Sequence, residues 1–255
     1  MEAVLTLAQL TDCHLQNNPS QLYRDIDVEQ RLDRVLSELL STEQSVDALL
    51  WTGDLVHHGR AQGYRRLRQR IAELALPSYW IPGNHDDAAL MQQLGGALNR
   101  RALITEHWAV ILLDSSSLPD GRGSGALAQP ELDYLQQQLN QYREKNCLIV
   151  LHHNPVPVQS VWQDKIMLSN AAAFWDVVDE ASQVKAVLCG HVHQQREIDY
   201  RAVKVLTTPS SSVQFKAGCE QFTIEDDPLL ERPGYRLLQL YPDGQIKTSV
   251  KRVEC

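Results

Sequence analysis

Five short apolar segments of this chain each run into aspartate, asparagine or histidine, and this repeated pattern constrains the fold more than any other feature. The segments are Val4–Leu10, Ala48–Trp51, Tyr79–Ile81, Cys147–Leu151 and Val184–Cys189. Between several of them, apolar residues recur at helical spacing. Strands that alternate with helices form largely parallel sheets, and ligands bind beyond the carboxyl ends of such strands. The pattern therefore predicts an α/β fold in which distant polar residues meet at one rim.

The remaining segments extend this pattern without a visible domain boundary. Helical spacing covers roughly 28–39, 64–74, 130–139 and 171–178. Further strands are expected at Ala109–Leu113, Val203–Thr207, Tyr235–Tyr241 and Gln245–Val250, the last two joined by a turn at Pro242-Asp243-Gly244. The acidic segment 225–234 is expected to be a surface loop. We therefore expect residues 1–255 to form a single domain.

Charge and cysteine content exclude several classes of protein. The 24 basic residues are outnumbered by 32 acidic ones, giving a net charge of −8, so the chain lacks the basic stripe that tracks a nucleic-acid polymer. Five scattered cysteines without a CxxC pair indicate reduced thiols in the cytoplasm. No apolar run reaches the length of a membrane span, and no basic residue precedes the first apolar segment as in a signal peptide. We expect a cytoplasmic monomer or homodimer.

The polar residues at the strand ends share the chemistry of metal ligands. They are Asp12, His14, Asp54, Asn84, His152, His191 and His193. Burying a polar group costs free energy unless the group is paired, and metal ions are the simplest common partner for this set. Oxygen and imidazole ligands without a thiolate suit Mn, Fe, Co or Zn. The pattern therefore predicts a transition-metal site at the rim.

Five motifs resemble, in order and over nearly the whole chain, those of the calcineurin-like metallophosphoesterase superfamily. They are Asp12-x-His14, Gly53-Asp54, Gly83-Asn84-His85-Asp86, His152 and Gly190-His191-Val192-His193. The resemblance implies a four-layer sandwich of two mixed β-sheets flanked by helices, with two metal ions at one edge. One ion would take Asp12, His14, Asp54 and His193. The other would take Asp54, Asn84, His152 and His191, so that Asp54 bridges the two.

The same resemblance implies a mechanism. Two divalent ions against two carboxylates leave a charge of about +2 for a hydroxide and an anionic phosphate. A hydroxide that bridges the metals, formed from water whose pKa falls to about 7, would attack phosphorus. His85 is not a ligand in the family pattern; it would contact the phosphate and protonate the leaving group, and Asp86 would orient it. The substrate would contact His14, Asp54, Asn84, His85 and His193.

A closer resemblance, to bacterial class III cyclic nucleotide phosphodiesterases, is carried by loop segments. They are His152–Val158, Trp162–Leu168, Gly190–Gln194 and Thr208–Phe215. The resemblance implies hydrolysis of 3′,5′-cyclic AMP to 5′-AMP, with Fe or Mn as the metals. The apolar residues Val158, Trp162, Met167 and Phe215 could wall a purine pocket, and ordinary loop packing would explain them equally well.

Other functions stay open at this point. The chain could hydrolyse another small diester, such as a 2′,3′-cyclic nucleotide or a nucleotide-sugar lipid. A protein phosphatase is disfavoured because nothing resembles the extra arginine-bearing motifs of that group. A metal-free binding scaffold is disfavoured because every ligand position is filled. His57 stands where purple acid phosphatases carry a metal-bound tyrosine, which argues against that group.

Several polar residues near the motifs are not expected to be ligands; they would support the ligands or face solvent. They are His57, His58, His107, Asp114 and His153. His153 follows a ligand directly and should point the other way on a regular strand. Cys13 and Cys189 are expected to be small buried hydrophobic residues.

Overall fold

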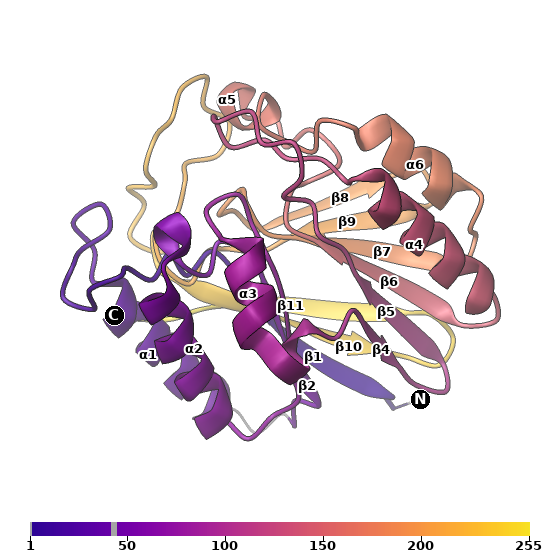
Figure 1. Ribbon diagram of the computed structural model, residues 1–255, viewed down its shortest axis with the longest axis horizontal. Helices are drawn as coiled ribbons and strands as arrows, with labels where there is room; N and C mark the ends of the chain where they lie inside the picture. Colours follow the sequence, from indigo (N-terminus) through magenta and orange to yellow (C-terminus); the bar gives the residue numbers. More distant parts are fainter. Residues whose placement is uncertain (1, 42–44) are drawn as a thin grey trace.

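Two mixed β-sheets pack face to face, and helices cover both outer faces (Figure 1). The computed structural model describes residues 2–41 and 45–255. The strand order is β11-β10-β1-β2-β3 in the first sheet and β4-β5-β6-β7-β9-β8 in the second. The predicted four-layer sandwich is confirmed, whereas the single domain over the whole chain stays a prediction.

In the first sheet β1, β2 and β3 run parallel, and the antiparallel strands β10 and β11 lie on one side only. In the second sheet β5, β6, β7 and β9 run parallel, with antiparallel β4 and β8 at the two edges. The first sheet contains β1 (Leu5–Leu10), β2 (Ala48–Thr52), β3 (Ser78–Ile81), β10 (Gly234–Leu240) and β11 (Ile246–Arg252). The second contains β4 (Ala102–Ile104), β5 (Trp108–Leu112), β6 (Asn146–Leu151), β7 (Val184–Cys189), β8 (Arg196–Tyr200) and β9 (Val203–Thr207). The parallel strands β1–β3, β6 and β7 therefore end toward the same rim.

The helices follow the strands in the order that the sequence predicted, with additions. They are α1 (Val28–Ser41), α2 (Ala61–Glu73), α3 (Ala88–Gly95), α4 (Gln129–Gln141), α5 (Val161–Asp164) and α6 (Ala171–Asp179), with short 3-10 turns η1 (His57–Gly59) and η2 (Gly96–Asn99). Helix α4 begins with a proline in its first turn, where the missing N–H does no harm. Helices α3 and α5 and strands β4 and β8 were not predicted.

Successive side chains of a strand point to opposite faces of the sheet, and this alternation explains how four layers form. Strands β1 and β2 are buried along their whole length, as expected for parallel strands covered on both faces. Leu7 and Leu50 belong to the core between the two sheets. Leu10 and Trp51 belong to the outer core that includes residues of α1 and α2. Each face of the strand thus buries its own set of side chains.

Polar contacts join the two sheets close to the rim. In the first sheet, the Gln9 side-chain amide donates to the Cys189 carbonyl of β7 at 3.1 Å and to Thr52 Oγ1 at 2.7 Å. His152, which follows β6, is bonded through Nδ1 to the Thr52 carbonyl at 2.8 Å. These bonds fix the ends of β2, β6 and β7 relative to one another. Among the described residues, no helix is long and apolar enough to cross a membrane.

Candidate metal centre

The loops that carry the predicted ligands have an unusual backbone. Five of the seven have a positive φ: Asp12 (55°), His14 (49°), Asp54 (51°), His191 (71°) and His193 (52°). Residues other than glycine rarely adopt this conformation, and it persists only where the surrounding structure enforces it. Such strain clusters at functional sites. The loops at the rim are therefore shaped to aim these side chains.

Two motif glycines make room for the ligands. A Cβ atom on Gly83 would lie against the Asp54 carboxylate, and one on Gly53 would overlap the His152 ring. Gly53 also has a φ of +91°, which side chains disfavour. The glycines at these positions thus allow the close approach of Asp54 and His152.

The first group of ligands comes from the ends of β1, β2 and β7. The Nε2 atoms of His14 and His193 lie 3.3 Å apart, and His193 Nε2 lies 3.2 Å from Asp12 Oδ1. His14 Nε2 is 3.8 Å from Asp54 Oδ2. All four side chains are buried. Two imidazole nitrogens and two carboxylates around one point match the donor set of a divalent transition metal.

The second group lies on the other side of Asp54. The same Asp54 Oδ2 is 3.5 Å from His152 Nε2. Asp12 Oδ1 is 4.0 Å from the same histidine nitrogen. His152 Nε2 and Asn84 Oδ1 are buried without a hydrogen-bond partner. Buried polar atoms are almost always paired, so these two orphaned atoms fit a site that holds a cation. Asp54 Oδ2 lies within 4 Å of a histidine nitrogen in each group.

Three histidines are held in a fixed tautomer by backbone carbonyls. His152 and His193 use Nδ1, toward Thr52 O at 2.8 Å and Val213 O at 2.6 Å. His191 uses Nε2, toward Ile166 O at 3.1 Å. A carbonyl can only accept, so the bonded nitrogen carries the proton and the other nitrogen keeps its lone pair. This is the usual arrangement around metal-binding histidines.

Burial keeps the rings of His14 and His191 neutral. Burial lowers the pKa of His191 to about 3 and the pKa of His14 well below its ordinary value. Burial also disfavours the charged form of His152, but the carboxylates of Asp54 and Asp12 outweigh it and raise the pKa to about 9. Without a metal, the positive charge of a protonated His152 offsets the charge of Asp54 Oδ2, 3.5 Å from Nε2. A divalent cation would take over this role and release the proton.

His85 and Asn84 lie at the open side of the centre. Both line a surface pocket together with Ser116 and Pro119. The backbone N–H of His85 donates to Asp54 Oδ1 at 2.8 Å, and its ring centroid is 5.1 Å from that of His14. The His85 ring can therefore reach a molecule bound in front of the ligands.

The structure gives Asp86 a role in addition to the predicted one. Its carboxylate accepts hydrogen bonds from the backbone N–H groups of Leu55, Val56 and Gly83 and from the Tyr64 hydroxyl. No bond from it to the His85 ring occurs among the described contacts. Asp86 ties the loop that carries Asn84 and His85 to the loop after Asp54, and its role in orienting the His85 imidazole stays a prediction.

Several residues that were not expected to be ligands have other contacts or lie at the surface. Both ring nitrogens of His153 are bonded, to Ser115 Oγ at 2.8 Å and to Gly123 O at 3.2 Å. His58 and Asp114 are not buried. Cys13 and Cys189 are fully buried, and burial raises the pKa of the Cys13 thiol to about 12. Thiols in this state do not compete for a metal.

The sequence did not predict that three serines hold the backbone of the first ligand loop, which carries Asp12. The hydroxyls of Ser210 and Ser212 donate to the Asp12 carbonyl at 2.7 and 2.8 Å, and the Ser211 N–H donates to the Thr11 carbonyl at 3.0 Å. These serines fix the backbone that presents Asp12. A run of three serines gives no signal of its own, because serine is common in any loop.

An aromatic cluster flanks the centre on the side of His193. The Phe215 ring stacks on His193 with centroids 4.0 Å apart. Trp162 and Phe222 meet Phe215 edge to face at 5.3 and 5.1 Å. Phe222 is 41% exposed and was not singled out by its sequence. Val158, by contrast, is buried and belongs to the packing of the loop.

Comparison with known proteins agrees with this geometry. The family model for calcineurin-like phosphoesterase matches residues 5–195. A 3′,5′-cyclic adenosine monophosphate phosphodiesterase CpdA of Haemophilus influenzae is 35% identical, over 98% of this chain and 91% of that protein. The CpdA of Escherichia coli K12 is 33% identical over 99% and 91%. A 3′,5′-cyclic-nucleotide phosphodiesterase of Nostoc is 36% identical over 98% and 92%.

Solved structures confirm the architecture. A dimetal phosphatase from Danio rerio superposes with a TM-score of 0.67 at 13% identity, covering 99% of this chain and 100% of that one. GAP50 of Plasmodium gives a TM-score of 0.66 at 16% identity, covering 99% and 89%. At these identities the likeness extends to the fold alone.

Proposed function

Because the chain belongs to the calcineurin-like phosphoesterase family, we propose that its rim centre holds two divalent metal ions and hydrolyses 3′,5′-cyclic AMP to 5′-AMP. The chain is a cyclic nucleotide phosphodiesterase, as its similarity to CpdA proteins over nearly the whole length supports. The observation that carries the two-metal centre is the pair of orphaned buried atoms, His152 Nε2 and Asn84 Oδ1, beside an Asp54 oxygen that faces both ligand groups.

The residues around Asp54 divide between the two ions. Asp12, His14, Asp54 and His193 would hold one, and Asp54, Asn84, His152 and His191 the other. When bound, the ions supply positive charge and lower the pKa of water to about 7. We further propose Fe or Mn as the metals, since the set has nitrogen and oxygen donors and no thiolate. The cysteines, which form no disulfide among the described residues, support the cytoplasm as the location. A monomer or homodimer is proposed.

Hydrolysis to 5′-AMP breaks the bond between phosphorus and the 3′ oxygen. Water adds an oxygen to phosphorus, and the departing 3′ oxygen takes up a proton. His85 lies at the open side of the centre, and its backbone is held by Asp54, so its imidazole can donate that proton. Asp86 and Tyr64 hold the loop on which His85 stands. The substrate phosphate would meet His14, Asp54, Asn84, His85 and His193.

The aromatic cluster of Trp162, Phe215 and Phe222 offers a place for the purine. It starts at the Phe215 ring stacked on His193 and extends to the partly exposed Phe222. Flat apolar rings bind bases by stacking, with about 1–3 kcal/mol per base. An adenine on this cluster would leave the cyclic phosphate near the ligands.

A panel of substrates tests the proposal. Protein loaded with Mn²⁺ is given 3′,5′-cyclic AMP, 3′,5′-cyclic GMP, 2′,3′-cyclic AMP, a nitrophenyl diester and a nitrophenyl monoester. We expect 5′-AMP as the product and the highest kcat/KM for 3′,5′-cyclic AMP. If 2′,3′-cyclic AMP or the monoester turned over well while no 5′-AMP formed, the substrate would be wrong and only the reaction class would stand.

A further inference from the structure

We propose that His57 is a positioning residue of the metal centre: its Nδ1 accepts a hydrogen bond from His14 Nδ1–H, and this bond holds the lone pair of His14 Nε2 toward the ion. The inference rests on the proposed function, because it takes His14 to be a metal ligand. It assigns a role to a histidine that neither the sequence motifs nor the ligand sets include.

His14 is an exception among the candidate ligand histidines. The rings of His152, His191 and His193 each use a backbone carbonyl to fix the tautomer. The Nδ1 of His14 instead faces another ring nitrogen, His57 Nδ1, at 3.3 Å. Two ring nitrogens at this distance form a hydrogen bond only when one carries a proton and the other a lone pair.

The surroundings of His14 decide which nitrogen is the donor. Its Nε2 lies 3.3 Å from His193 Nε2 and 3.8 Å from Asp54 Oδ2. A nitrogen in that position must keep its lone pair to bind a cation. The proton of the neutral His14 ring is then on Nδ1, and His57 Nδ1 is the acceptor. His57 thus does for His14 what a carbonyl does for each of the other three.

The backbone holds His57 in register with His14. The N–H of His14 donates to Asp54 O at 2.9 Å, that of Leu15 to Leu55 O at 3.0 Å, and that of His57 to Leu15 O at 2.9 Å. These bonds form a short parallel ladder between the two ligand loops. The ladder fixes the distance between the two rings before any metal binds.

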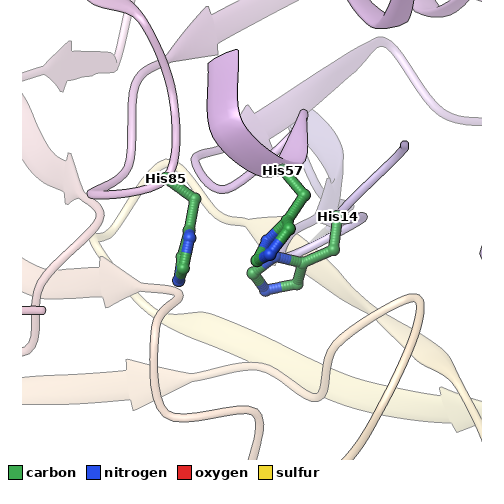
Figure 2. A group of neighbouring side chains, drawn as sticks. All are labelled: His14, His57 and His85. Atoms are coloured by element: carbon green, nitrogen blue, oxygen red, sulfur yellow. The ribbon is translucent and has the colours of Figure 1, made fainter. Parts of the chain in front are cut away.

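Other rings keep the pair in place. Tyr23 stacks on His14 with centroids 4.7 Å apart and an interplanar angle of 17°. His57 stacks on His85 at 4.6 Å and 28°. Figure 2 shows the rings of His14, His57 and His85 side by side, with His57 on the turn η1. His57 also has tilted contacts with Tyr23 and His58. Its hydrogen bond through Nδ1 to His14 and its face contact with His85 can be separated by substitution.

Two substitutions separate these contacts. His57→Phe keeps a flat ring against His85 but removes the acceptor. His57→Asn loses the ring, yet its side-chain oxygen can take the position of Nδ1. The control is His107→Phe, the same substitution at a residue far from the centre. His107 precedes β5, at the end of that strand away from the rim, and its side chain is 38% exposed.

The experiment measures Zn²⁺ affinity by competition with a chromophoric chelator. Loss of the outer partner of a metal-binding histidine weakens metal binding by roughly 10–100-fold. We expect His57→Phe to lower the affinity for one of the two ions by this factor and to leave the affinity for the other unchanged. His57→Asn and His107→Phe should both bind two ions as the wild type does. Rescue by asparagine would not follow from a merely structural role of the ring.

The outcomes separate this inference from the proposed function. If the wild type bound two ions and His57→Phe bound both equally well, the metal centre would stand and the role of His57 would be wrong. The role would also be wrong if His57→Asn lost affinity as much as His57→Phe. If the wild type bound fewer than two ions, both the proposed two-metal centre and this inference would be wrong.

A second measurement needs no variant and therefore does not depend on how the substitutions fold. In zinc-loaded wild type, nitrogen-15 NMR identifies the protonated nitrogen of each imidazole. A proton on His14 Nδ1 that couples to His57 Nδ1 would support the proposal. A proton on His57 Nδ1, or on His14 Nε2, would overturn it.

Discussion

Asp54 is the residue at which the two ligand groups meet. One of its oxygens lies 3.8 Å from His14 Nε2 and 3.5 Å from His152 Nε2, and the other accepts the His85 N–H. Burial raises its pKa, but the charges of His152 and His85 outweigh burial and hold the pKa well below the usual range. Asp54 is therefore an anion that both ions can share.

Asp54→Ala should consequently lose both ions and nearly all turnover. Asn84 serves one ion only, so Asn84→Ala should keep about one ion per chain and a measurable residual activity. Elemental analysis after gel filtration, paired with assays on cyclic AMP, checks both variants. Equal metal content and equal turnover in the two variants would contradict the bridging role of Asp54.

His85 belongs to the chemistry and not to metal binding. His85→Ala should keep two ions but lower kcat for cyclic AMP by roughly 10²–10⁴-fold, the scale of general acid catalysis. A nitrophenyl leaving group needs little protonation, so turnover of a nitrophenyl diester should fall much less. Stopped assays on both substrates give the comparison. Loss of metal, or equal losses on both substrates, would show that the assigned role is wrong.

At the scale of single residues, the sequence predicts which side chains gather but not all of their roles. The ligand positions stand out because apolar strands deliver them to one rim. Asp86 is a predicted partner of His85, but its carboxylate also accepts three backbone N–H groups, which the sequence does not show. The contact between His57 and His14 depends on a turn in which His58 has a φ of 60°. No local sequence pattern predicts this turn.

Among the elements, strand β10 carries an unusual inter-sheet contact. Arg236 is fully buried, and it donates to the Thr207 carbonyl at the end of β9 and to Thr248 Oγ1, both at 2.8 Å. It also bonds to Glu197 of β8 at 3.1 Å. The guanidinium thus joins the first sheet to the edge of the second.

Arg236→Ala should lower the free energy of unfolding by about 3–5 kcal/mol, because it leaves buried acceptors unpaired. Urea titration followed by circular dichroism measures this change. Arg143→Ala, on the surface, is the matched control and should stay within roughly 0.5 kcal/mol. A loss below about 1 kcal/mol for Arg236→Ala would mean that water replaces these bonds easily.

The loop that contains α5 carries the proposed purine contact. Trp162 meets Phe215 edge to face at 5.3 Å, and Phe215 stacks on His193. Trp162→Ala should raise KM for cyclic AMP by roughly 10-fold, which corresponds to a stacking contribution of about 1–3 kcal/mol. A nitrophenyl diester has no purine, so its KM should change little. The same KM change for both substrates would place the purine elsewhere.

Buried apolar strands could be predicted, whereas edge strands and elements without a clear apolar pattern could not. Buried parallel strands such as β7 (Val184–Cys189) read as continuous apolar runs. Strand β8 alternates charged and apolar residues at an exposed edge, and β4 has only three residues. Helix α3 follows a ligand motif directly, and its start depends on a bond from the Leu90 N–H to Asp87. Such elements are fixed by tertiary contacts more than by pattern.

For the whole molecule, the centre joins the two sheets. Asp12 and Asp54 follow strands of the first sheet, whereas His152 and His191 follow strands of the second. Ions held between them therefore act as cross-links, and a ligand that binds only the folded state raises its stability. Loading the protein with metal should raise Tm together with turnover, and a chelator should lower both.

The most direct test titrates metal-free protein with Mn²⁺ while 5′-AMP formation from cyclic AMP and Tm are recorded at each step. We expect no turnover before metal is added, a rise of both quantities with added Mn²⁺, and a plateau of turnover at two equivalents per chain. A plateau at one equivalent, or full turnover by the metal-free protein, would contradict the two-metal phosphodiesterase centre.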